Sequence, residues 1–407
     1  MTSLDAARSQ RRQDQSWRPQ SWRQSLAAQQ PAWPDEATAD AVLGRLRDLP
    51  GLVSGSECAE LTNALAGVAA GRGFLLQGGD CAETFDALSS IGLHSRCRLL
   101  SSMARTVTAS SGLPTVIVGR IAGQYAKPRS APTEDIGQAC LPSYRGDMIN
   151  SQAPDPSARQ PDPFRMLTAY FHSAAAMNAL RLRAADEPRI YVSHEALVLG
   201  YEEALVRLVR DPWHWFGASA HLLWIGDRTR DPGGAHVRFL SGLANPVGVK
   251  IGPTTPPGDV VALCETLNPG RVPGRLTLIT RLGASVVATA LPPIIRAVTG
   301  AGHPVVWVCD PMHGNTRRTV SGYKTRDVAA IIAEIRGFFA AHREQGTRPG
   351  GIHLELAGEH VTECVGGGVN PVAEDRVPHA YQSACDPRLS PAQALECAAV
   401  VAAELNR

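Results

Sequence analysis

The sequence predicts an α/β fold, a closed (β/α)8 TIM barrel with an N-terminal helical extension. Two observations predict it: eight short β-rich runs alternate with helical segments, and each run ends in polar, loop-like residues. Alternating strands and helices form a parallel sheet, and eight such units close into a barrel. The runs are Phe74–Gln77, Thr115–Val118, Arg189–Val192, His221–Ile225, Val247–Val249, Arg275–Thr280, Val305–Val308 and Gly351–Leu354.

The barrel is expected to span residues 71–407, after an N-terminal tail and helical extension over residues 1–70. A chain of 407 residues could hold two domains. However, barrels often exceed about 250 residues as one unit. Residues 1–33 show no clean period, so we expect a mobile tail that docks through Trp17, Trp22 or Trp33.

Helical spacing of apolar residues predicts the elements around the strands. Between the second and third strands lie about 70 residues, 119–188, and a loop this long usually has a function. Ser390 and Pro391, followed by Gln393, give the N-cap and capping-box signal of the last helix. The predicted helices are Asp35–Asp48, Glu57–Ala70, Phe164–Ala184, Asp327–His342 and the segment from Pro391 to Leu405.

The composition is typical of a globular enzyme, with 44% hydrophobic and 19% charged residues. Forty basic and 38 acidic side chains give a formal charge of +2, so no global field recruits nucleic acid or an anionic membrane. No apolar run reaches the roughly 20 residues of a membrane helix, and the N-terminus lacks the hydrophobic core of a signal peptide, so a cytoplasmic location is expected. The nine cysteines lack CxxC spacing and are expected to be reduced.

Four potential metal ligands follow strands of the predicted barrel. In this fold the loops after the strands converge on one mouth, so these side chains should meet. A thiolate, an imidazole and two carboxylates suit Mn²⁺, Fe²⁺, Co²⁺ or Zn²⁺, whereas Mg²⁺ or Ca²⁺ would not favour the sulfur. Each residue alone could be structural, but four at one rim indicate a metal site. They are Cys81, His313, Glu355 and Asp386.

Four cationic side chains also end strands: Arg120, Arg228, Lys250 and Arg281. At one rim they would repel each other, so we expect them to bind an anion. Arginine matches phosphate and carboxylate oxygens with two hydrogen bonds, and lysine acts as a point charge, so a small ligand with both groups fits. The alternative is that they are surface charges or form ion pairs with Asp227 and Glu195.

A third cationic group lies in the long loop. Lys127-Pro128-Arg129-Ser130 offers two cations and a hydroxyl on a turn stiffened by proline, which could hold a second phosphate. Lys324 and Arg326, after the seventh strand, could add further positive charge. Together with the first group, this loop predicts two phosphorylated substrates.

From about residue 30 onward the chain resembles the type II 3-deoxy-D-arabino-heptulosonate 7-phosphate (DAHP) synthases. The motifs that carry the resemblance occur in the family's order. They are QGGDCAETF (77–85), GRIAGQYAKPRS (119–130), YRGDMIN (144–150), SHEALVLGYE (193–202), WIGDRTR (224–230), NPVGVKIGP (245–253), PGRLTLITRLG (273–283), CDPMHGNT (309–316), GGIHLELAGEHVTEC (350–364) and ACDPRL (384–389).

The resemblance implies a metal-bearing TIM barrel that condenses phosphoenolpyruvate with erythrose 4-phosphate and releases phosphate. It assigns Cys81, His313, Glu355 and Asp386 to the metal, with Mn²⁺ or Co²⁺ expected. It assigns Arg120, Lys127, Arg228, Lys250 and Arg281 to phosphoenolpyruvate, and Lys127, Pro128, Arg129 and Ser130 to erythrose 4-phosphate. One departure is Asp227, where the family usually has Glu, so the role of this position in phosphoenolpyruvate binding is open.

The implied chemistry gives Lys127 as proton donor to the new alkoxide, with Arg120 also at the reacting centre, while the residue that activates water stays open. The enzyme is expected to serve the shikimate pathway or a secondary metabolite such as a phenazine, and to be a homo-oligomer. Two alternatives remain: an amino-sugar-forming relative that uses an imino analogue of erythrose 4-phosphate, and a non-catalytic barrel that acts as a regulatory partner. No expected ligand or arginine is missing, which disfavours the second.

Longer members of this family insert a helical pair before the third strand, and that pair helps to form sites for aromatic amino acids. Here only Ala185-Asp-Glu-Pro188 separates the predicted helix from the strand. The short connection therefore predicts an enzyme without this regulatory site.

Overall fold

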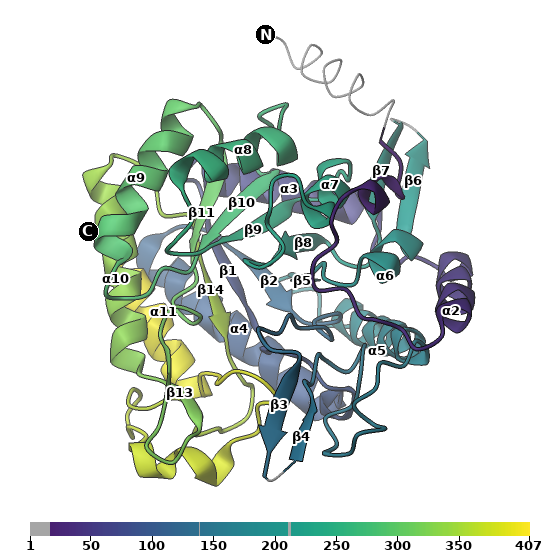
Figure 1. The fold of residues 1–407 in the computed structure, drawn as a ribbon. Coiled ribbons are helices and arrows are strands. Elements are labelled where there is room, and N and C mark those ends of the chain that lie inside the picture. Colours follow the sequence, from purple (N-terminus) through teal and green to yellow (C-terminus); the bar gives the residue numbers. More distant parts are fainter. Residues whose placement is uncertain (1–16, 138, 211–212) are drawn as a thin grey trace.

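The computed structural model describes residues 17–407 except 138 and 211–212, and these form a closed eight-stranded parallel barrel (Figure 1). Neighbouring strands follow chain order, and the last barrel strand pairs with the first. This confirms the predicted fold class and all eight predicted strands. The strands are β1 (Phe74–Gly79), β2 (Thr115–Arg120), β5 (Ile190–Glu195), β8 (Leu222–Ile225), β9 (Val247–Ile251), β10 (Leu276–Thr280), β11 (Val305–Cys309) and β14 (Gly351–Glu355).

Several strands extend beyond their predicted ends, so polar residues expected in loops belong to the strands themselves. Arg120, Glu195, Lys250 and Glu355 lie within β2, β5, β9 and β14. The parallel register sets Gly79 of β1 opposite both Arg120 and Glu355. Backbone pairing therefore fixes the height of these side chains at the rim of the barrel.

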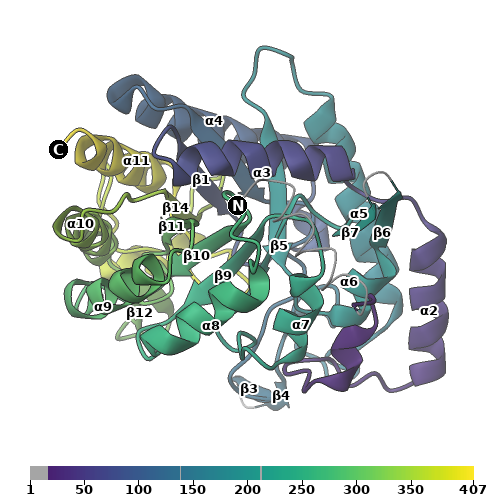
Figure 2. The same ribbon diagram turned by 90° about the horizontal axis from the view of Figure 1, so that it is seen from above.

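Ten helices surround or precede the strands in the described residues, and Figure 2 shows most of them around the barrel. The five predicted helices are present with ends shifted by a few residues, and Ser390 forms the predicted capping box. The helices are α2 (Glu36–Asp48), α3 (Gly55–Ala69), α4 (Ser90–Ser111), α5 (Phe164–Arg181), α6 (Leu199–Ala204), α7 (Ala235–Ser241), α8 (Pro257–Leu267), α9 (Val287–Gly300), α10 (Val328–Glu344) and α11 (Pro391–Leu405).

The interior of the barrel is a separate apolar cluster that includes one face of α3. Because α3 leads directly into β1, it lies at the N-terminal ends of the strands and closes that side. Each fully buried aliphatic or aromatic side chain contributes about 1.5–3 kcal/mol to stability. Because apolar side chains fill the interior and α3 closes the N-terminal side, the polar site residues lie at the C-terminal mouth. The cluster includes Leu61, Leu65 and Val68 of α3 and Leu75, Val118, Trp224 and Ile279 of the strands.

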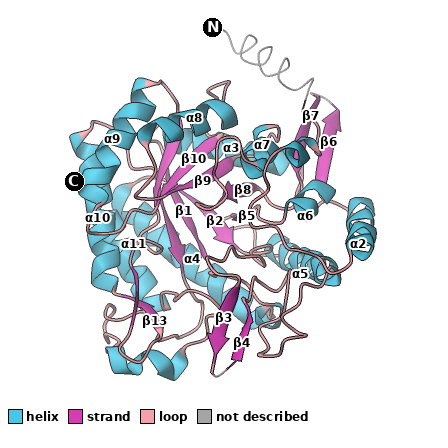
Figure 3. Ribbon diagram, viewed as in Figure 1, coloured by secondary structure: helices cyan, strands magenta, loops and turns pink. Residues whose placement is uncertain are grey.

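Three antiparallel hairpins outside the barrel were not predicted (Figure 3). The sequence carried a signal for one, because alternating apolar residues flank the dipeptide Asp-Pro, which favours a chain reversal. The other hairpins are short and largely polar, so periodicity could not reveal them. The hairpins are β3 (Thr133–Ile136) with β4 (Ala139–Pro142), β6 (Val206–Arg210) with β7 (Trp213–Gly217), and β12 (Thr316–Arg318) with β13 (Lys324–Arg326).

Residues 17–34, which we call the N-terminal strap, are docked on the rest of the protein instead of forming a mobile tail. Trp17 and Trp22 are buried, as the docking hypothesis required. The Trp17 indole donates to the Arg238 carbonyl at 2.9 Å, and the Trp22 indole donates to Glu203 at 2.8 Å. Burial of two large rings with satisfied N–H groups outweighs the weak local propensity. Residues 1–16 lie outside the described residues, and the division of the chain at residue 70 stays a prediction.

Two further sequence-based expectations can be compared with the structure. Within residues 17–407, apart from the three undescribed positions, no helix is long and apolar enough to cross a membrane. All nine cysteines carry free thiols, which agrees with the predicted reduced set.

Candidate active site

A cavity of about 230 Å³ opens at the C-terminal mouth of the barrel. All the predicted site residues line it except Glu355 and Arg326, which are fully buried. The predicted residues in the wall are Cys81, Arg120, Lys127, Pro128, Arg129, Ser130, Asp227, Arg228, Lys250, Arg281, His313, Lys324 and Asp386. The convergence predicted from the strand ends is therefore present.

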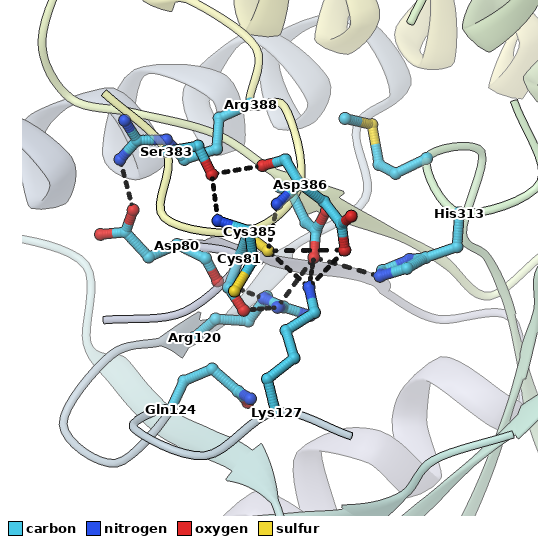
Figure 4. A network of polar contacts seen from close by, with 12 residues as sticks. Asp80, Cys81, Arg120, Gln124, Lys127, His313, Ser383, Cys385, Asp386 and Arg388 are labelled. Carbon is cyan, nitrogen blue, oxygen red and sulfur yellow. Dashed lines mark hydrogen bonds and ion pairs between the residues drawn. The ribbon is translucent and has the colours of Figure 1, made fainter. Parts of the chain in front are cut away.

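The four predicted metal ligands meet at one side of this cavity (Figure 4). Ligand atoms of Cys81, Glu355 and Asp386 all lie within 4.8 Å of one another. His313 Nε2 lies 3.1 Å from Glu355 Oε1. These donors come from the ends of β1 and β14 and from loops after β11 and β14, so barrel closure brings them together.

The Lys127 ammonium lies among these donors and acts as a stand-in cation. Its Nζ is 2.6 Å from Asp386 Oδ2, 3.5 Å from Glu355 Oε1 and in contact with the Cys81 sulfur. Burial alone would lower the pKa of Lys127, but the neighbouring acids raise it well above its ordinary value. The position therefore binds positive charge, and the sulfur, nitrogen and oxygen donors fit a divalent transition metal.

The acids of the cluster have the charge that a cation site requires. Burial opposes ionisation of Glu355, but His313, Lys127 and Arg326 hold its pKa well below the ordinary range. Burial likewise opposes ionisation of Asp386, and Lys127 is the main cation that lowers its pKa. In contrast, burial raises the pKa of the Cys81 thiol.

The expectation that the rim cations need an anion because no acids accompany them is partly wrong. Lys250 pairs with the buried Asp310, and Arg281 pairs with Asp227 at 3.2 Å. Arg120 lies 3.1 Å from Glu355 and also donates to the carbonyls of residues 80 and 81. Tertiary contacts supply partners from other strands, which adjacent sequence could not show.

Excess positive charge nevertheless remains at the mouth. The exposed Arg228 has no ion-pair partner among the described residues. Burial, opposed in part by Asp310, lowers the pKa of Lys250 to about 8. A bound anion would therefore stabilise the charged form of Lys250.

The 127–130 loop is held from several sides. Arg129 forms an ion pair with Glu134, and the Lys127 amide donates to the Arg145 carbonyl at 2.8 Å. Lys324 lies 2.9 Å from Asp386, which places its charge between this loop and the metal ligands. The loop and the strand-end cations thus form two positive groups on one cavity.

Sequence reasoning missed several residues of the site. His353, interpreted as an ordinary buried histidine, lies 2.6 Å from the Arg120 guanidinium. Asp310 contacts Lys250 and His313 together. The proximity of Asp310 to His313 in the CDPMH motif was a signal, whereas His353 gave none because it lies inside a strand.

Glu195, which the sequence analysis considered only as an ion-pair partner of the rim cations, is the most informative further residue of the site. It lines the cavity, and its buried Oε1 has no hydrogen-bond partner in the structure. A Cβ at Gly226 would lie 2.1 Å from this oxygen, so only glycine allows the carboxyl group its position. Burial raises the pKa of Glu195, although Lys127, Lys250 and Arg120 oppose the rise.

Comparison with known proteins identifies the family. The class-II DAHP synthetase family pattern matches residues 17–187 and 181–402. The chain belongs to the class-II DAHP synthetase family. Its function is therefore DAHP synthesis, an aldol-type transfer reaction. This confirms the function predicted from the motifs.

Individual relatives agree with this assignment. The chain is 44% identical to phospho-2-dehydro-3-deoxyheptonate aldolase AroG of Mycolicibacterium smegmatis, over 93% of each protein. It is 40% identical to the phospho-2-dehydro-3-deoxyheptonate aldolase of Streptomyces coelicolor, over 94% of this chain and 96% of the relative. The solved aldolase structure from Francisella tularensis is only 14% identical, with a TM-score of 0.56 over 90% of this chain and 96% of that one. That last likeness concerns the fold alone.

The metal site gives a prediction for the two cysteines at the mouth. The side chains of Cys81 and Cys385 lie side by side (Figure 4). In the metal-free DAHP synthase a mild oxidant should join the two sulfurs, with loss of two electrons and two protons, because no metal then shields Cys81. Peptide mapping of the oxidised protein should find this disulfide, while the exposed Cys140 stays unpaired within the chain. Free Cys81 and Cys385 after oxidation would contradict it.

Proposed function

We propose that this DAHP synthase binds phosphoenolpyruvate and erythrose 4-phosphate at the two cationic groups of the cavity. Arg120, Arg228, Lys250 and Arg281 would hold the phosphate and carboxylate of phosphoenolpyruvate. Lys127, Arg129 and Ser130, stiffened by Pro128, would hold the phosphate of the aldose. The observation that carries this proposal is that both groups flank a single cluster of metal-type donors in one cavity.

Cys81, His313, Glu355 and Asp386 are the residues proposed to hold the metal. The donor set supports Mn²⁺, with Co²⁺ as an alternative. When bound, such an ion would act as a Lewis acid toward the aldehyde oxygen. Lys127 would then give up its place among the donors and turn its ammonium to the substrate.

The cations align the substrates for carbon–carbon bond formation. C3 of phosphoenolpyruvate attacks the aldehyde carbon, and Lys127, which is protonated, donates a proton to the resulting alkoxide. Positive charge develops at C2, water adds there, and inorganic phosphate leaves. Positioning two anionic substrates in register supplies much of the rate, because it removes the entropy cost of their encounter. Asp227 supports this register by orienting Arg281.

Glu195 is proposed as the base that takes the proton from the attacking water. Its unpartnered oxygen lies in the cavity, and the cations near it are those assigned to phosphoenolpyruvate. A base must be ionised to act, so activity falls as the pH drops through the pKa of Glu195. Because burial raises that pKa, the loss should occur at a higher pH than for an ordinary glutamate.

The test is Glu195→Gln, which keeps the shape and removes the base. We expect kcat to fall by about 100-fold or more, since general bases contribute at least this factor. Both Michaelis constants should change little, and the acid limb of the kcat/KM profile should disappear. The matched control is the exposed Glu344→Gln on α10. A Glu195→Gln enzyme with normal kcat and a normal acid limb would refute the assignment.

Product analysis of the wild-type enzyme distinguishes erythrose 4-phosphate from the alternative aldehyde. Mass analysis of the product with erythrose 4-phosphate or its imino analogue distinguishes DAHP from the amino sugar. A homo-oligomer is also proposed, and it is supported by exposed apolar side chains on α5 and directly after it. These are Phe164, Phe171 and Leu182.

The connection after α5 predicts how the enzyme responds to aromatic amino acids. α5 ends at Arg181 and β5 begins at Ile190, with no helix between them. The wall that a helical pair would build is absent from this described segment, so Trp, Phe and Tyr should not inhibit. Initial rates at saturating metal, with millimolar amino acids singly and in pairs, check this. Marked inhibition by any combination would show that other parts of the chain form an effector site.

A further inference from the structure

The N-terminal strap connects α7 to the loop that carries Lys127 and Arg129. Near α7, the Ala235 amide donates to the Leu26 carbonyl at 3.1 Å. Gln30 then anchors the strap to the loop after β5. Its side-chain amide donates to the Leu197 carbonyl at 2.7 Å and accepts from the Leu199 amide at 3.0 Å. The strap is therefore fixed to the barrel independently of the 127–130 loop.

From this anchor, Gln29 reaches the backbone of the phosphate-type loop. Its Oε1 accepts a hydrogen bond from the Arg129 amide at 3.0 Å. Gln29 has φ 62°, a left-handed conformation that is uncommon outside glycine. The backbone conformation sets the direction of the Gln29 Cα–Cβ bond, and the hydrogen bond from the Arg129 amide links the strap to the backbone of the loop.

Arg145 holds the strap and the loop together. Its guanidinium donates to the Gln29 carbonyl at 2.5 Å and to the Gln30 carbonyl at 3.2 Å. Its own carbonyl accepts from the Lys127 amide at 2.8 Å. The strap therefore touches both cationic residues of the loop, one directly and one through Arg145.

We propose that Gln29 is a positioning residue that sets the geometry of the aldose-phosphate side of the site. This inference rests on the proposed assignment of Lys127, Arg129 and Ser130 to that phosphate. The other anion site is held in a different way, because Lys250 pairs with Asp310 and Arg281 pairs with Asp227. Loss of the Gln29 contact should therefore affect one substrate and spare the other.

Gln29→Ala removes the acceptor. We expect KM for erythrose 4-phosphate to rise about five- to tenfold, the factor that corresponds to one lost hydrogen bond. KM for phosphoenolpyruvate should stay within twofold of the wild type, as an approximate limit set by the same scale. Gln29→Glu keeps an acceptor oxygen and should restore KM for erythrose 4-phosphate. Gln24→Ala, at an exposed strap position, is the matched control.

Hydrogen exchange of the amides in residues 127–130 supplies a readout that does not depend on turnover. Faster exchange there in Gln29→Ala, with an unchanged melting temperature, together with the selective rise in KM, would support the inference. Unchanged exchange, or equal rises in both Michaelis constants, would overturn it. Faster exchange without any change in KM would show that this loop does not bind the aldose phosphate, so the site assignment would fail along with the inference.

Discussion

Chelation is expected to abolish turnover of this DAHP synthase, and Mn²⁺ or Co²⁺ should restore it. The expectation rests on the convergence of Cys81, Glu355 and Asp386 within 4.8 Å and on His313 beside them. Cys81→Ser should weaken metal binding by about 100-fold or more, since even neighbours of metal ligands contribute up to this factor. Elemental analysis and initial rates of the same samples measure both effects.

The control separates loss of metal from loss of fold. Serine is nearly the size of cysteine, so Cys81→Ser should keep the wild-type circular dichroism spectrum. Cys140→Ser, at an exposed position in β4, should keep both metal and activity. Full activity in an exhaustively chelated sample would exclude a metal-dependent mechanism.

The two anion sites should separate in a pair of arginine variants. Arg281→Ala should raise KM for phosphoenolpyruvate far more than KM for erythrose 4-phosphate, and Arg129→Ala should do the reverse. Loss of one charged contact to a substrate anion costs about 2–5 kcal/mol, or roughly 30-fold to several-thousand-fold in affinity. Arg129 and Arg281 are equally exposed, so the two variants should show effects of similar size. Michaelis constants for both substrates in each variant provide the measurement.

Arg296→Ala, an exposed position on α9, is the matched control and should leave both constants unchanged. Equal rises in the two constants for each arginine variant would show that the two sites are merged. A reversed pattern would show that their assignment is swapped.

The sequence predicted the barrel because its signals are local and repeated. Each strand such as Val305–Cys309 is a short β-branched run, and each is followed by a polar group at the mouth. The fold then brings all those groups together, which is why Cys81 and Asp386 could be paired across the chain. The resemblance to the family then indicated which of these residues would bind the metal and which would bind each substrate.

What the sequence could not predict depends on contacts between distant strands. His353 contacts Arg120, and Asp310 contacts Lys250, although neither pair is close in sequence. The sequence named Trp22 as a docking residue but could not identify its partner Glu203, which lies about 180 residues away. Periodicity describes which face of an element is apolar, but it does not identify the opposite partner.

The pairing of β14 with β1 has a consequence for how the enzyme matures. Glu355 stands in register with Gly79, so the first and last strands of the barrel bring its carboxylate and the sulfur of Cys81 together. A nascent chain that lacks its final strand cannot assemble this donor set. If these residues hold the metal as proposed, metal binding would follow closure of the barrel, and an ion that binds only the closed form would oppose its reopening by mass action. A metal held by the proposed ligands would therefore stabilise the pairing of β1 with β14, in addition to its proposed role in the reaction.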